Sequence, residues 1–522
     1  MESQHISIFV IFFFDQFLQI YFNFRDYKQI AMKYILSIDA GTTSSRSIIF
    51  DNNANQIGVS QFEFSQLFPK KGWVEHDANE IWSTQIKSIK DVLEKSMISP
   101  SDIAAIGITN QRETTLIWDK KTGNPVYNAI VWQDKRTSDF CDKLKKNNLS
   151  DLFQKKTGLI IDAYFSATKI KWIIDNIPNI KNKANNGELC FGTIDSWLIW
   201  KLTDGKFHVT DVTNASRTML YNINKLDWDG ELLKILDIPK SILPKVVESS
   251  EIVGYTSENI IGEKIPISGI AGDQQAALFG QLCINKGDVK NTYGTGCFCI
   301  MNTGEKPVFS KNKMLTTIAW KINGKTSYAI EGSVFIAGAL VQWLRDKLKI
   351  IKSASEIEDL AKTVEDNGGV TFIPALSGLG APYWSQRAQG AIFGITRDTE
   401  SGHIARAGLE SIALRTMDII IEMQKDANSN FSNLKVDGGA SNNNLLMQIQ
   451  SNLLEKNVIR PKITETTALG AAFLAGLSVN YWQSIDSLKS MWKMDCEFKP
   501  DKNNKKNIIE LWKKRIKKTI DE

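Results

Sequence analysis

The chain has 522 residues, of which 43% are hydrophobic and 23% are charged. This composition is typical of a folded globular protein and excludes a largely disordered one, and the length favours two large domains over a single core. The formal net charge of +5 is small for this length. Because the lysines of 505–518 alternate with apolar residues at helical spacing, we interpret them as a solvated helix face, and we expect neither a nucleic-acid nor a membrane partner.

Cysteine and histidine usage argues against disulfides and zinc. The six cysteines are dispersed along the chain, and the four histidines are scattered. These spacings match neither a disulfide framework nor a zinc site. Reduced thiols are the simplest interpretation, so we expect a cytoplasmic location.

The first 32 residues differ from the rest of the chain. Residues 6–14 are strongly apolar, but a membrane-spanning helix needs about 20 such residues. No lysine or arginine precedes this run and no convincing small-residue cleavage site follows it, which argues against a signal peptide. Met32 stands directly before the first predicted strand. We therefore interpret residues 1–32 as a dispensable N-terminal extension, with a targeting segment as the alternative.

Residues 34–51 predict a β-hairpin whose turn binds phosphate. An apolar strand leads into a Gly/Thr/Ser turn and then into a second apolar strand. Glycine lets the backbone approach a ligand closely, and the hydroxyl and N–H groups around it can contact phosphate oxygens. Asp39 ends the first strand. It is a candidate ligand for Mg²⁺, which proteins bind through one or two carboxylates plus nucleotide phosphate.

Two further strands are followed by polar tips. The run 104–113 passes from an apolar strand into the adjacent charges Arg112 and Glu113, and the run 267–275 reaches Asp273 and a glutamine after a glycine. A cation beside a carboxylate suits a ligand with several hydroxyl groups, so we expect the two tips to meet over one small polyol. For either segment alone, the competing interpretation is a strand followed by a solvated turn.

Strands and helices alternate through the first half of the chain. Helical patterns over 78–96 and 168–176 separate the predicted strands, which is the arrangement of an α/β fold. Residues 288–300 then repeat the strand, Gly/Thr turn and strand of the first hairpin, which suggests an internally duplicated architecture. The predicted domains are 33–281, with the polyol tips and the first hairpin, and 282–522, with the nucleotide site.

The second half contains a further candidate nucleotide site. Residues 334–346 and 401–423 are expected to be helices, the second with a buried seam at fourfold spacing. Residues 434–443 predict a strand that enters a glycine turn and then a helix. A helix N-terminus preceded by glycines is a natural site for an anion or a nucleotide.

Six motifs occur in a fixed order along the chain. They are Asp-Ala-Gly-Thr-Thr-Ser-Ser-Arg (39–46), Asn-Gln-Arg-Glu (110–113), Val-Trp-Gln-Asp (131–134), Gly-Ile-Ala-Gly-Asp-Gln-Gln (269–275), Tyr-Gly-Thr-Gly-Cys-Phe (293–298) and Asp-Gly-Gly-Ala (437–440). Together they resemble the glycerol kinases of the FGGY carbohydrate kinase family, and the likeness runs from about Met32 to near the C-terminus.

The resemblance implies an α/β fold of two actin-like or ribonuclease H-like domains, hinged around a nucleotide cleft. It also implies ATP-dependent phosphorylation of glycerol to sn-glycerol 3-phosphate, with ATP and Mg²⁺ as cofactors and a dimer as the expected homo-oligomer. The residues that match the family's glycerol contacts are Arg112, Glu113, Trp132, Tyr164, Asp273, Gln274 and Phe298. The residues assigned to the phosphates and the nucleotide are Thr42, Thr43, Ser44, Arg46, Thr295, Gly338, Gln342, Gly439 and Asn443. Asp273 is the expected general base, and Asp39 and Asp273 are the carboxylates expected at Mg²⁺.

The chain departs from the family pattern at two places. Ala40 stands where glycerol kinases usually carry glutamine, and residues 257–265 lack the paired glycines and the arginine of the loop that binds fructose 1,6-bisphosphate in bacterial members. Two alternatives therefore stay open. One is a kinase for another polyol or sugar, and the other is an ATP-driven clamp or scaffold of the same fold that performs no small-molecule chemistry.

Overall fold

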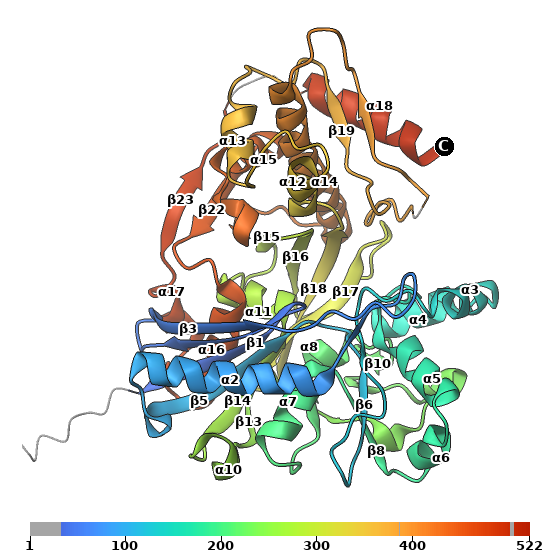
Figure 1. The fold of residues 1–522 in the computed structure, drawn as a ribbon, viewed down its shortest axis with the longest axis vertical. Coiled ribbons are helices and arrows are strands. Elements are labelled where there is room, and N and C mark those ends of the chain that lie inside the picture. The colour runs from blue at the N-terminus through green and yellow to red at the C-terminus, as the bar shows by residue number, and fades with distance from the viewer. Residues whose placement is uncertain (1–32, 386, 502–505, 522) are drawn as a thin grey trace, which may run out of the picture.

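The structure, a computed structural model, describes residues 33–385, 387–501 and 506–521. The predicted N-terminal extension, residues 1–32, lies outside the described residues. Figure 1 shows two lobes stacked along the longest axis, the lower one mainly blue and green and the upper one mainly yellow to red.

The lower lobe is built on a six-stranded sheet. Its strands are β1 (Tyr34–Ala40), β2 (Ser44–Phe50), β3 (Gln56–Glu63), β5 (Ile103–Asn110), β13 (Ser250–Tyr255) and β14 (Pro266–Gly272), in the order β13-β14-β5-β1-β2-β3. Strand β5 runs parallel to both β1 and β14, whereas β1 and β2 form an antiparallel hairpin. The carboxyl ends of β1, β5 and β14 therefore meet at one edge of the sheet.

Helices and short strands surround this sheet. The helices are α2 (Ala78–Ser96), α3 (Ser138–Lys146), α4 (Ser150–Thr157), α5 (Ser166–Asn176), α6 (Ile180–Asn185), α7 (Ile194–Leu202), α8 (Val212–Ala215), α9 (Gly230–Leu236), α10 (Glu258–Ile261) and α11 (Asp273–Gly280). The short strands are β4 (Glu75–His76), β6 (Leu116–Asp119), β7 (Ala129–Ile130), β8 (Leu189–Gly192), β9 (Val209–Asp211), β10 (Tyr221–Asn222), β11 (Asp227–Trp228) and β12 (Lys245–Val247). Helix α2 begins where the Asp77 side chain accepts a hydrogen bond from the Asn79 N–H group, an N-cap that satisfies a backbone donor without an intrahelical partner.

The upper lobe is built on a seven-stranded sheet. Its strands are β15 (Val289–Tyr293), β16 (Cys297–Gly304), β17 (Leu315–Ile322), β18 (Lys325–Val334), β21 (Asn433–Asp437), β22 (Asn457–Pro461) and β23 (Met494–Phe498), in the order β17-β18-β16-β15-β21-β22-β23. A separate pair is β19 (Thr371–Ile373) and β20 (Ala391–Phe393). The helices of this half of the chain are α12 (Gly338–Asp346), α13 (Glu356–Ala361), α14 (Ser401–Ala427), α15 (Asn444–Leu454), α16 (Thr466–Ser478), α17 (Ile485–Lys489) and α18 (Lys506–Asp521), of which α16 and α17 lie beside the lower-lobe sheet.

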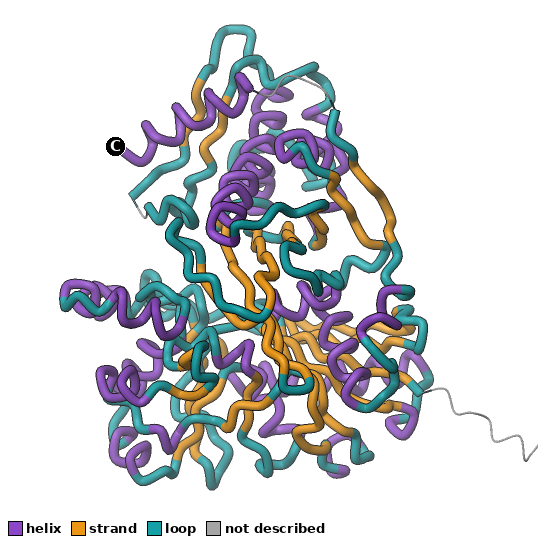
Figure 2. The backbone as a smooth tube through the Cα atoms, turned by 180° about the vertical axis from the view of Figure 1, so that it is seen from behind, coloured by secondary structure: helices purple, strands orange, loops and turns teal. Residues whose placement is uncertain are grey.

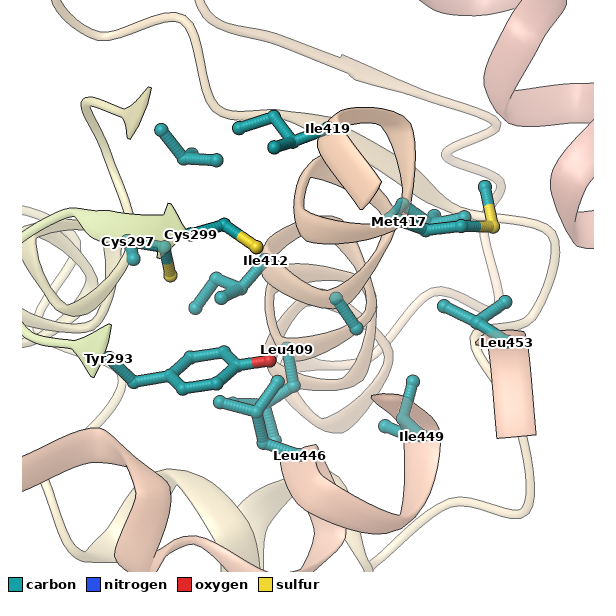
Figure 3. Close-up of a cluster of buried hydrophobic side chains, with 14 of the residues drawn as sticks. Tyr293, Cys297, Cys299, Leu409, Ile412, Met417, Ile419, Leu446, Ile449 and Leu453 are labelled. Atoms are coloured by element: carbon teal, nitrogen blue, oxygen red, sulfur yellow. The ribbon is translucent and has the colours of Figure 1, made fainter. Parts of the chain in front are cut away.

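The core of the upper lobe lies between the β15–β16 hairpin and helices α14 and α15. Figure 3 shows Tyr293, Cys297 and Cys299 of the hairpin facing Leu409 and Ile412 of α14. All five side chains are buried. The hairpin is therefore held rigidly from behind, and its turn, residues 294–296, lies at the end of a packed scaffold.

Strands β17 and β18 reach from the upper lobe toward the lower one, and both views show long strands running through the centre of the molecule (Figures 1 and 2). The backbone N–H group of Ser249 donates to the Lys321 carbonyl oxygen at 2.8 Å, and that of Thr316 donates to Gly158 at 2.9 Å. Residues on these strands can therefore contribute to a site at the junction of the lobes.

Helix α16 lies in the chain between β22 and β23 of the upper-lobe sheet but packs on the lower-lobe sheet. Glycines allow this close approach, because a Cβ atom at Gly107 of β5 would lie 2.2 Å from the Ala471 carbonyl oxygen. A Cβ at Gly470 would lie 1.8 Å from the Ala276 carbonyl oxygen of α11. The lower lobe thus includes a helix from beyond residue 282, the position where the sequence pattern begins again.

Most predicted elements are present, and one boundary is corrected. The helices expected at 78–96 and 401–423 are α2 and α14. The helix expected at 334–346 begins only at Gly338, because Val334 still pairs with Cys297 between β18 and β16. Within the described residues, none of the helices has both the length and the apolar composition needed to span a membrane.

Gly470→Ala should lower the apparent melting temperature, although alanine favours a helix over glycine by about 1 kcal/mol. The added Cβ would overlap a backbone oxygen. Overpacking lowers the free energy of unfolding by roughly 1–3 kcal/mol, and we expect this contact to lie at the upper end of that range. We expect a drop of about 3 °C or more. Gly230→Ala is the matched control, because a Cβ at this first residue of α9 meets nothing within 4 Å. A Gly470→Ala protein that melts at or above the wild-type temperature would contradict this packing.

Candidate active site

The predicted polyol tips meet at the edge where parallel strands of the lower lobe end. Asn110 of β5 lies in register with Ala40 of β1 and with Gly272 of β14. Arg112 follows β5 by two residues, and Asp273 is the first residue of α11, directly after β14. The Arg112 Nε atom lies 2.9 Å from Asp273 Oδ1. The order of the strands therefore brings the two tips into direct contact.

Arg112 belongs to a buried network that joins the lobes. Its Nη2 donates to Glu331 Oε1 at 3.0 Å, and Glu331 stands on β18 of the upper lobe. Arg217 donates to the same Glu331 oxygen at 3.1 Å and to Glu113 Oε1 at 2.6 Å. We call these five residues, Arg112, Glu113, Arg217, Asp273 and Glu331, the Arg112 network. It places two guanidinium groups among three carboxylates.

Glu331 and Arg112 of this network are ionised at neutral pH, whereas burial raises the pKa of Glu113. Burial by itself raises the pKa of Glu331. The charges of Arg112 and Arg217 oppose this effect and outweigh it, so that the pKa falls to about 2. Burial likewise lowers the pKa of Arg112, and the Glu331 and Asp273 carboxylates raise it well above its ordinary value. The side chains of Arg112 and Glu331 are 2% and 0% exposed, whereas that of Asp273 is 33% exposed. Asp273 is thus the carboxylate that a ligand can reach.

Glu113 has a backbone conformation that non-glycine residues rarely adopt. Its φ is +60°, a left-handed conformation that costs about 1–3 kcal/mol and clusters at functional sites. Its carbonyl oxygen accepts hydrogen bonds from Thr115 Oγ1 at 3.0 Å, Ser166 Oγ at 3.1 Å and Lys169 Nζ at 3.3 Å. These three donors hold the strained residue and aim its carboxylate at Arg217.

Three aromatic side chains form an aromatic wall beside the network. Trp132 lies edge to face against Tyr164, with ring centroids 5.7 Å apart, and against Phe298 at 6.4 Å. The Arg217 guanidinium lies 5.8 Å from the Tyr164 ring centroid. Phe298 belongs to β16 of the upper lobe. The wall therefore also draws on both lobes, and it is linked to the charges through Arg217.

The predicted phosphate-binding hairpin residues have unequal surroundings. Thr43 is exposed, while Thr42 Oγ1 accepts a hydrogen bond from Trp132 Nε1 at 3.1 Å. Ser44 is buried and its hydroxyl accepts from Gln61 Nε2 at 3.0 Å. Arg46 forms an ion pair with Glu465. Thr43 is thus the predicted hairpin residue that is open to solvent, and the Arg46 guanidinium already has a carboxylate partner.

The predicted nucleotide residues gather around the turn of the second hairpin, residues 294–296. The Gly338 N–H group at the start of α12 donates to the Gly294 carbonyl oxygen at 3.0 Å, and that of Ala339 donates to Thr295 at 3.0 Å. Gly438 packs behind the same hairpin, where a Cβ would lie 2.6 Å from the Tyr293 carbonyl oxygen. The three segments that the sequence assigns to the nucleotide therefore meet.

The remaining predicted nucleotide residues lie on these segments. Thr295 and Gln342 are exposed, and a Cβ at Gly439 would meet nothing within 4 Å. The Asn443 side chain accepts a hydrogen bond from the Leu446 N–H group at 2.8 Å and so forms the N-cap of α15.

Asp39 fits a magnesium site of the kind that relies on phosphate ligands. Burial raises the pKa of its carboxyl to about 6, Arg46 opposes this, and the nearby carboxylates of Glu465 and Asp273 raise it further. Such an excess of negative charge suits a divalent cation. In the described part of the chain no group of three or more histidine, cysteine, aspartate or glutamate side chains is placed to hold a metal by itself. This agrees with Mg²⁺ chemistry, in which one or two carboxylates act together with phosphate oxygens and water.

Family models match both halves of the chain. The model of the N-terminal domain of the FGGY family of carbohydrate kinases matches residues 34–280, and the model of its C-terminal domain matches residues 289–479. The chain belongs to the FGGY family of carbohydrate kinases. The family and the two-domain α/β fold expected from the sequence are confirmed.

Several proteins that are similar to this chain are named glycerol kinase. The chain is 59% identical to glycerol kinase of Burkholderia pseudomallei over 468 residues, which cover 90% of this chain and 94% of that protein. It is 57% identical to glycerol kinase 2 of Thermotoga maritima over 491 residues, which cover 94% and 99% of the two chains. The crystal structure of Plasmodium falciparum glycerol kinase with ADP has a TM-score of 0.88 at 40% identity, covering 94% of this chain and 98% of that one.

The sequence analysis missed part of the site of this FGGY kinase. Glu331 and Arg217 complete the Arg112 network, and Lys290 donates to Gln274 Oε1 at 2.6 Å. One signal was available for Glu331, because it is a single charge in the otherwise apolar and small-residue run 328–334. A lone carboxylate in a buried strand requires a partner.

Glu331→Gln should destabilise the protein strongly, because it leaves two buried guanidinium groups with fewer compensating charges. Breaking a buried ion pair in this way costs about 3–5 kcal/mol of the free energy of unfolding. Since the folded pKa of Glu331 lies below its ordinary value of 4.5, its stabilisation is complete above that value and is lost as the pH falls toward 2. The deficit of the variant should therefore narrow in acid.

Urea denaturation at a series of pH values measures this effect. Asp486→Asn is the control, because Asp486 pairs with Lys489 on the surface with 84% of its side chain exposed, and it should unfold like the wild type. Equal stability of Glu331→Gln and wild type at pH 7 would refute the role of Glu331 in holding the network.

Proposed function

We propose that this FGGY kinase transfers the terminal phosphoryl group of ATP to glycerol and produces sn-glycerol 3-phosphate. The observation that carries the proposal is the 2.9 Å contact between Arg112 and Asp273, which unites the two predicted polyol tips beside the aromatic wall. Relatives 57–59% identical over at least 90% of the chain are named glycerol kinases, which supports glycerol over another polyol.

The arrangement suits a molecule with three hydroxyl groups on three carbons. The partly exposed Asp273 carboxylate offers an acceptor to the polyol, and the Glu113 and Arg112 side chains, 1% and 2% exposed, would line the site behind it. Lys290 occupies Gln274 Oε1, so the Gln274 amide nitrogen is the group of that side chain left to donate toward a ligand. The aromatic wall provides a surface for the C–H edges of the polyol. A site of this kind rejects analogues that lack a hydroxyl, because its own polar groups would then be unpaired.

In this proposal Asp273 accepts the proton of the attacking terminal hydroxyl group. A positioned carboxylate does this in phosphoryl transfer, where most of the catalysis comes from placement and charge. Arg112 holds the Asp273 carboxylate in place from the buried side, and the exposed third of that side chain faces the ligand. Closure of the two lobes around the substrates excludes water, which would otherwise hydrolyse ATP.

In this proposal the two hairpins bind the phosphate groups, and the segment after β21 lies near the nucleoside. Thr42, Thr43 and the 294–296 turn would contact phosphate oxygens, and Gly439 and Asn443 would lie near the nucleoside. Asp39, with Asp273 nearby, would hold Mg²⁺. When bound, the metal neutralises negative charge on the phosphate oxygens.

Other predictions stay predictions. They are the cytoplasmic location, the dimer, the domain limits at 33–281 and 282–522, and the individual roles of the site residues. Of the two alternatives, a clamp without chemistry leaves the Arg112 network unexplained. A kinase for another polyol shares the network and differs only in the ligand that fits it.

A polyol panel tests the proposed function. ADP release is measured with glycerol, with longer polyols, with 1,3-propanediol, which lacks the central hydroxyl group, and without polyol. We expect glycerol to give the highest kcat/KM, and the product to be a substrate for an sn-glycerol 3-phosphate dehydrogenase. Faster turnover of another polyol would replace glycerol as the substrate, and ADP release independent of any polyol would favour the clamp.

Tyr164→Phe should raise the KM for glycerol by about 3–10-fold, because a neutral hydrogen bond contributes about 0.5–1.5 kcal/mol and the ring of the aromatic wall is kept. The KM for ATP should stay within twofold. Tyr328→Phe makes the same chemical change away from the site, where its hydroxyl donates to the Ile223 carbonyl oxygen at 2.9 Å. That variant should lose stability and keep both KM values. If Tyr164→Phe leaves the glycerol KM unchanged, Tyr164 does not bind the substrate through its hydroxyl.

A further inference from the structure

A closed circuit of hydrogen bonds connects the phosphate hairpin to the aromatic wall. Trp132 Nε1 donates to Thr42 Oγ1 at 3.1 Å, and the Trp132 backbone N–H group donates to Thr114 Oγ1 at 3.3 Å. Thr114 Oγ1 in turn donates to Gln111 Oε1 at 2.9 Å. Gln111 Nε2 donates to the Gly41 carbonyl oxygen at 3.0 Å. Gly41 and Thr42 are neighbours in the chain, so these four hydrogen bonds form a closed ring. We call this ring the Thr42–Trp132 circuit.

The partly buried Gln66 and the buried His76 support the circuit from behind. Gln66 Nε2 donates to the Thr42 carbonyl oxygen at 3.1 Å, and Gln66 Oε1 lies 2.8 Å from His76 Nε2. His76 Nδ1 lies 3.4 Å from Gln111 Nε2. The His76 side chain is fully buried and its ring meets that of Phe64 edge to face at 5.0 Å.

The partners fix the form of His76. Gln66 Nε2 is used as a donor, so Gln66 Oε1 is the atom facing His76 and can only accept, which places the proton on His76 Nε2. His76 Nδ1 is then the acceptor for Gln111 Nε2. Burial lowers the pKa of His76 to about 4, so the ring is neutral at pH 7, as this pattern requires. The Gln66 and Gln111 amides are thereby oriented by one imidazole.

The circuit has a mechanical consequence. The Gly41–Thr42 backbone is held by two amide donors, and the Thr42 hydroxyl is held by the indole of Trp132. The indole also forms the middle of the aromatic wall, between Tyr164 and Phe298. A shift of the phosphate hairpin therefore moves the indole, and a shift of the indole moves the hairpin.

We propose that His76, Gln66 and Gln111 are positioning residues that hold the phosphate hairpin and the Trp132 ring as one unit, so that a nucleotide and a polyol bind synergistically. The three residues touch neither ligand and act through Thr42 and Trp132. The synergy with glycerol rests on the proposed function, whereas the coupling between hairpin and indole does not.

The competing explanation is that His76 only fills the core. His208 is the matched control for it, because it is partly buried, has its pKa lowered to about 4 by burial, and donates from Nε2 to the Phe191 carbonyl oxygen at 2.7 Å. His208 packs against Trp118 and Trp200, which lie outside the circuit. A loss of stability alone would affect both histidine variants alike.

The first measurement is calorimetric titration of ADP with Mg²⁺, with and without saturating glycerol. In the wild type we expect glycerol to tighten ADP binding at least fivefold, within the usual range of coupling between sites. In His76→Phe this factor should fall below twofold, while His208→Phe should keep the wild-type factor. His76→Gln retains one donor and one acceptor and should recover part of it. Trp132→Phe replaces the indole by a smaller ring without the N–H donor to Thr42. It keeps the test decisive if His76→Phe does not fold.

The second measurement needs no polyol. Amide hydrogen exchange is followed at 41–43 and 131–134 as ADP is added. In the wild type both segments should become protected together, and in His76→Phe or Trp132→Phe only 41–43 should respond. Independent protection of the two segments in the wild type, or wild-type coupling in both variants, would overturn the proposal. If glycerol is not a substrate but the two segments respond together, the proposed function fails and the coupling stands.

Discussion

The structure depends on one buried guanidinium group, that of Arg112, which lies between carboxylates from the two lobes. Asp273 comes from the lower lobe and Glu331 from the upper one, at 2.9 and 3.0 Å from Arg112. A buried guanidinium without partners is costly, so the lobes must meet in the register that satisfies it. The same register fixes the direction of the Asp273 carboxylate, the group to which we assign the proton transfer.

The scaffold around this contact makes such precision possible. Parallel pairing of β5 with β1 and β14 brings three strand ends to one edge, and glycine contacts lock α16 against the same sheet. In the upper lobe, α14 and α15 support the β15–β16 hairpin from behind. Glu113 then adopts a strained φ of +60°, which persists because three donors hold its carbonyl oxygen. Rigid packing of the sheets and helices thus fixes the positions of the few polar groups at the site.

Local patterns in the sequence predicted the elements and the meeting of Arg112 with Asp273, because both residues follow apolar strands of one sheet. They also predicted the 288–300 hairpin and the glycine turn of 434–443, whereas Gly338 was assigned to the nucleotide only through the family resemblance. Glu331 and Arg217 were missed, because ion pairs between residues 114 or 219 positions apart leave no periodic signal. The placement of α16 on the lower lobe was missed for the same reason. The helix expected at 334–346 began too early, since pairing across β16 extends β18 to Val334.

The central claim is that Asp273 accepts a proton from the substrate while Arg112 and Glu331 hold it in place, and the kcat of Asp273→Asn tests it most directly. Asparagine keeps the size and hydrogen-bonding reach of the side chain but cannot accept the proton. We expect kcat to fall by about 10²–10⁴-fold, with ADP affinity within threefold of wild type and a melting temperature that confirms a folded protein. A folded variant with near-normal kcat would contradict the account.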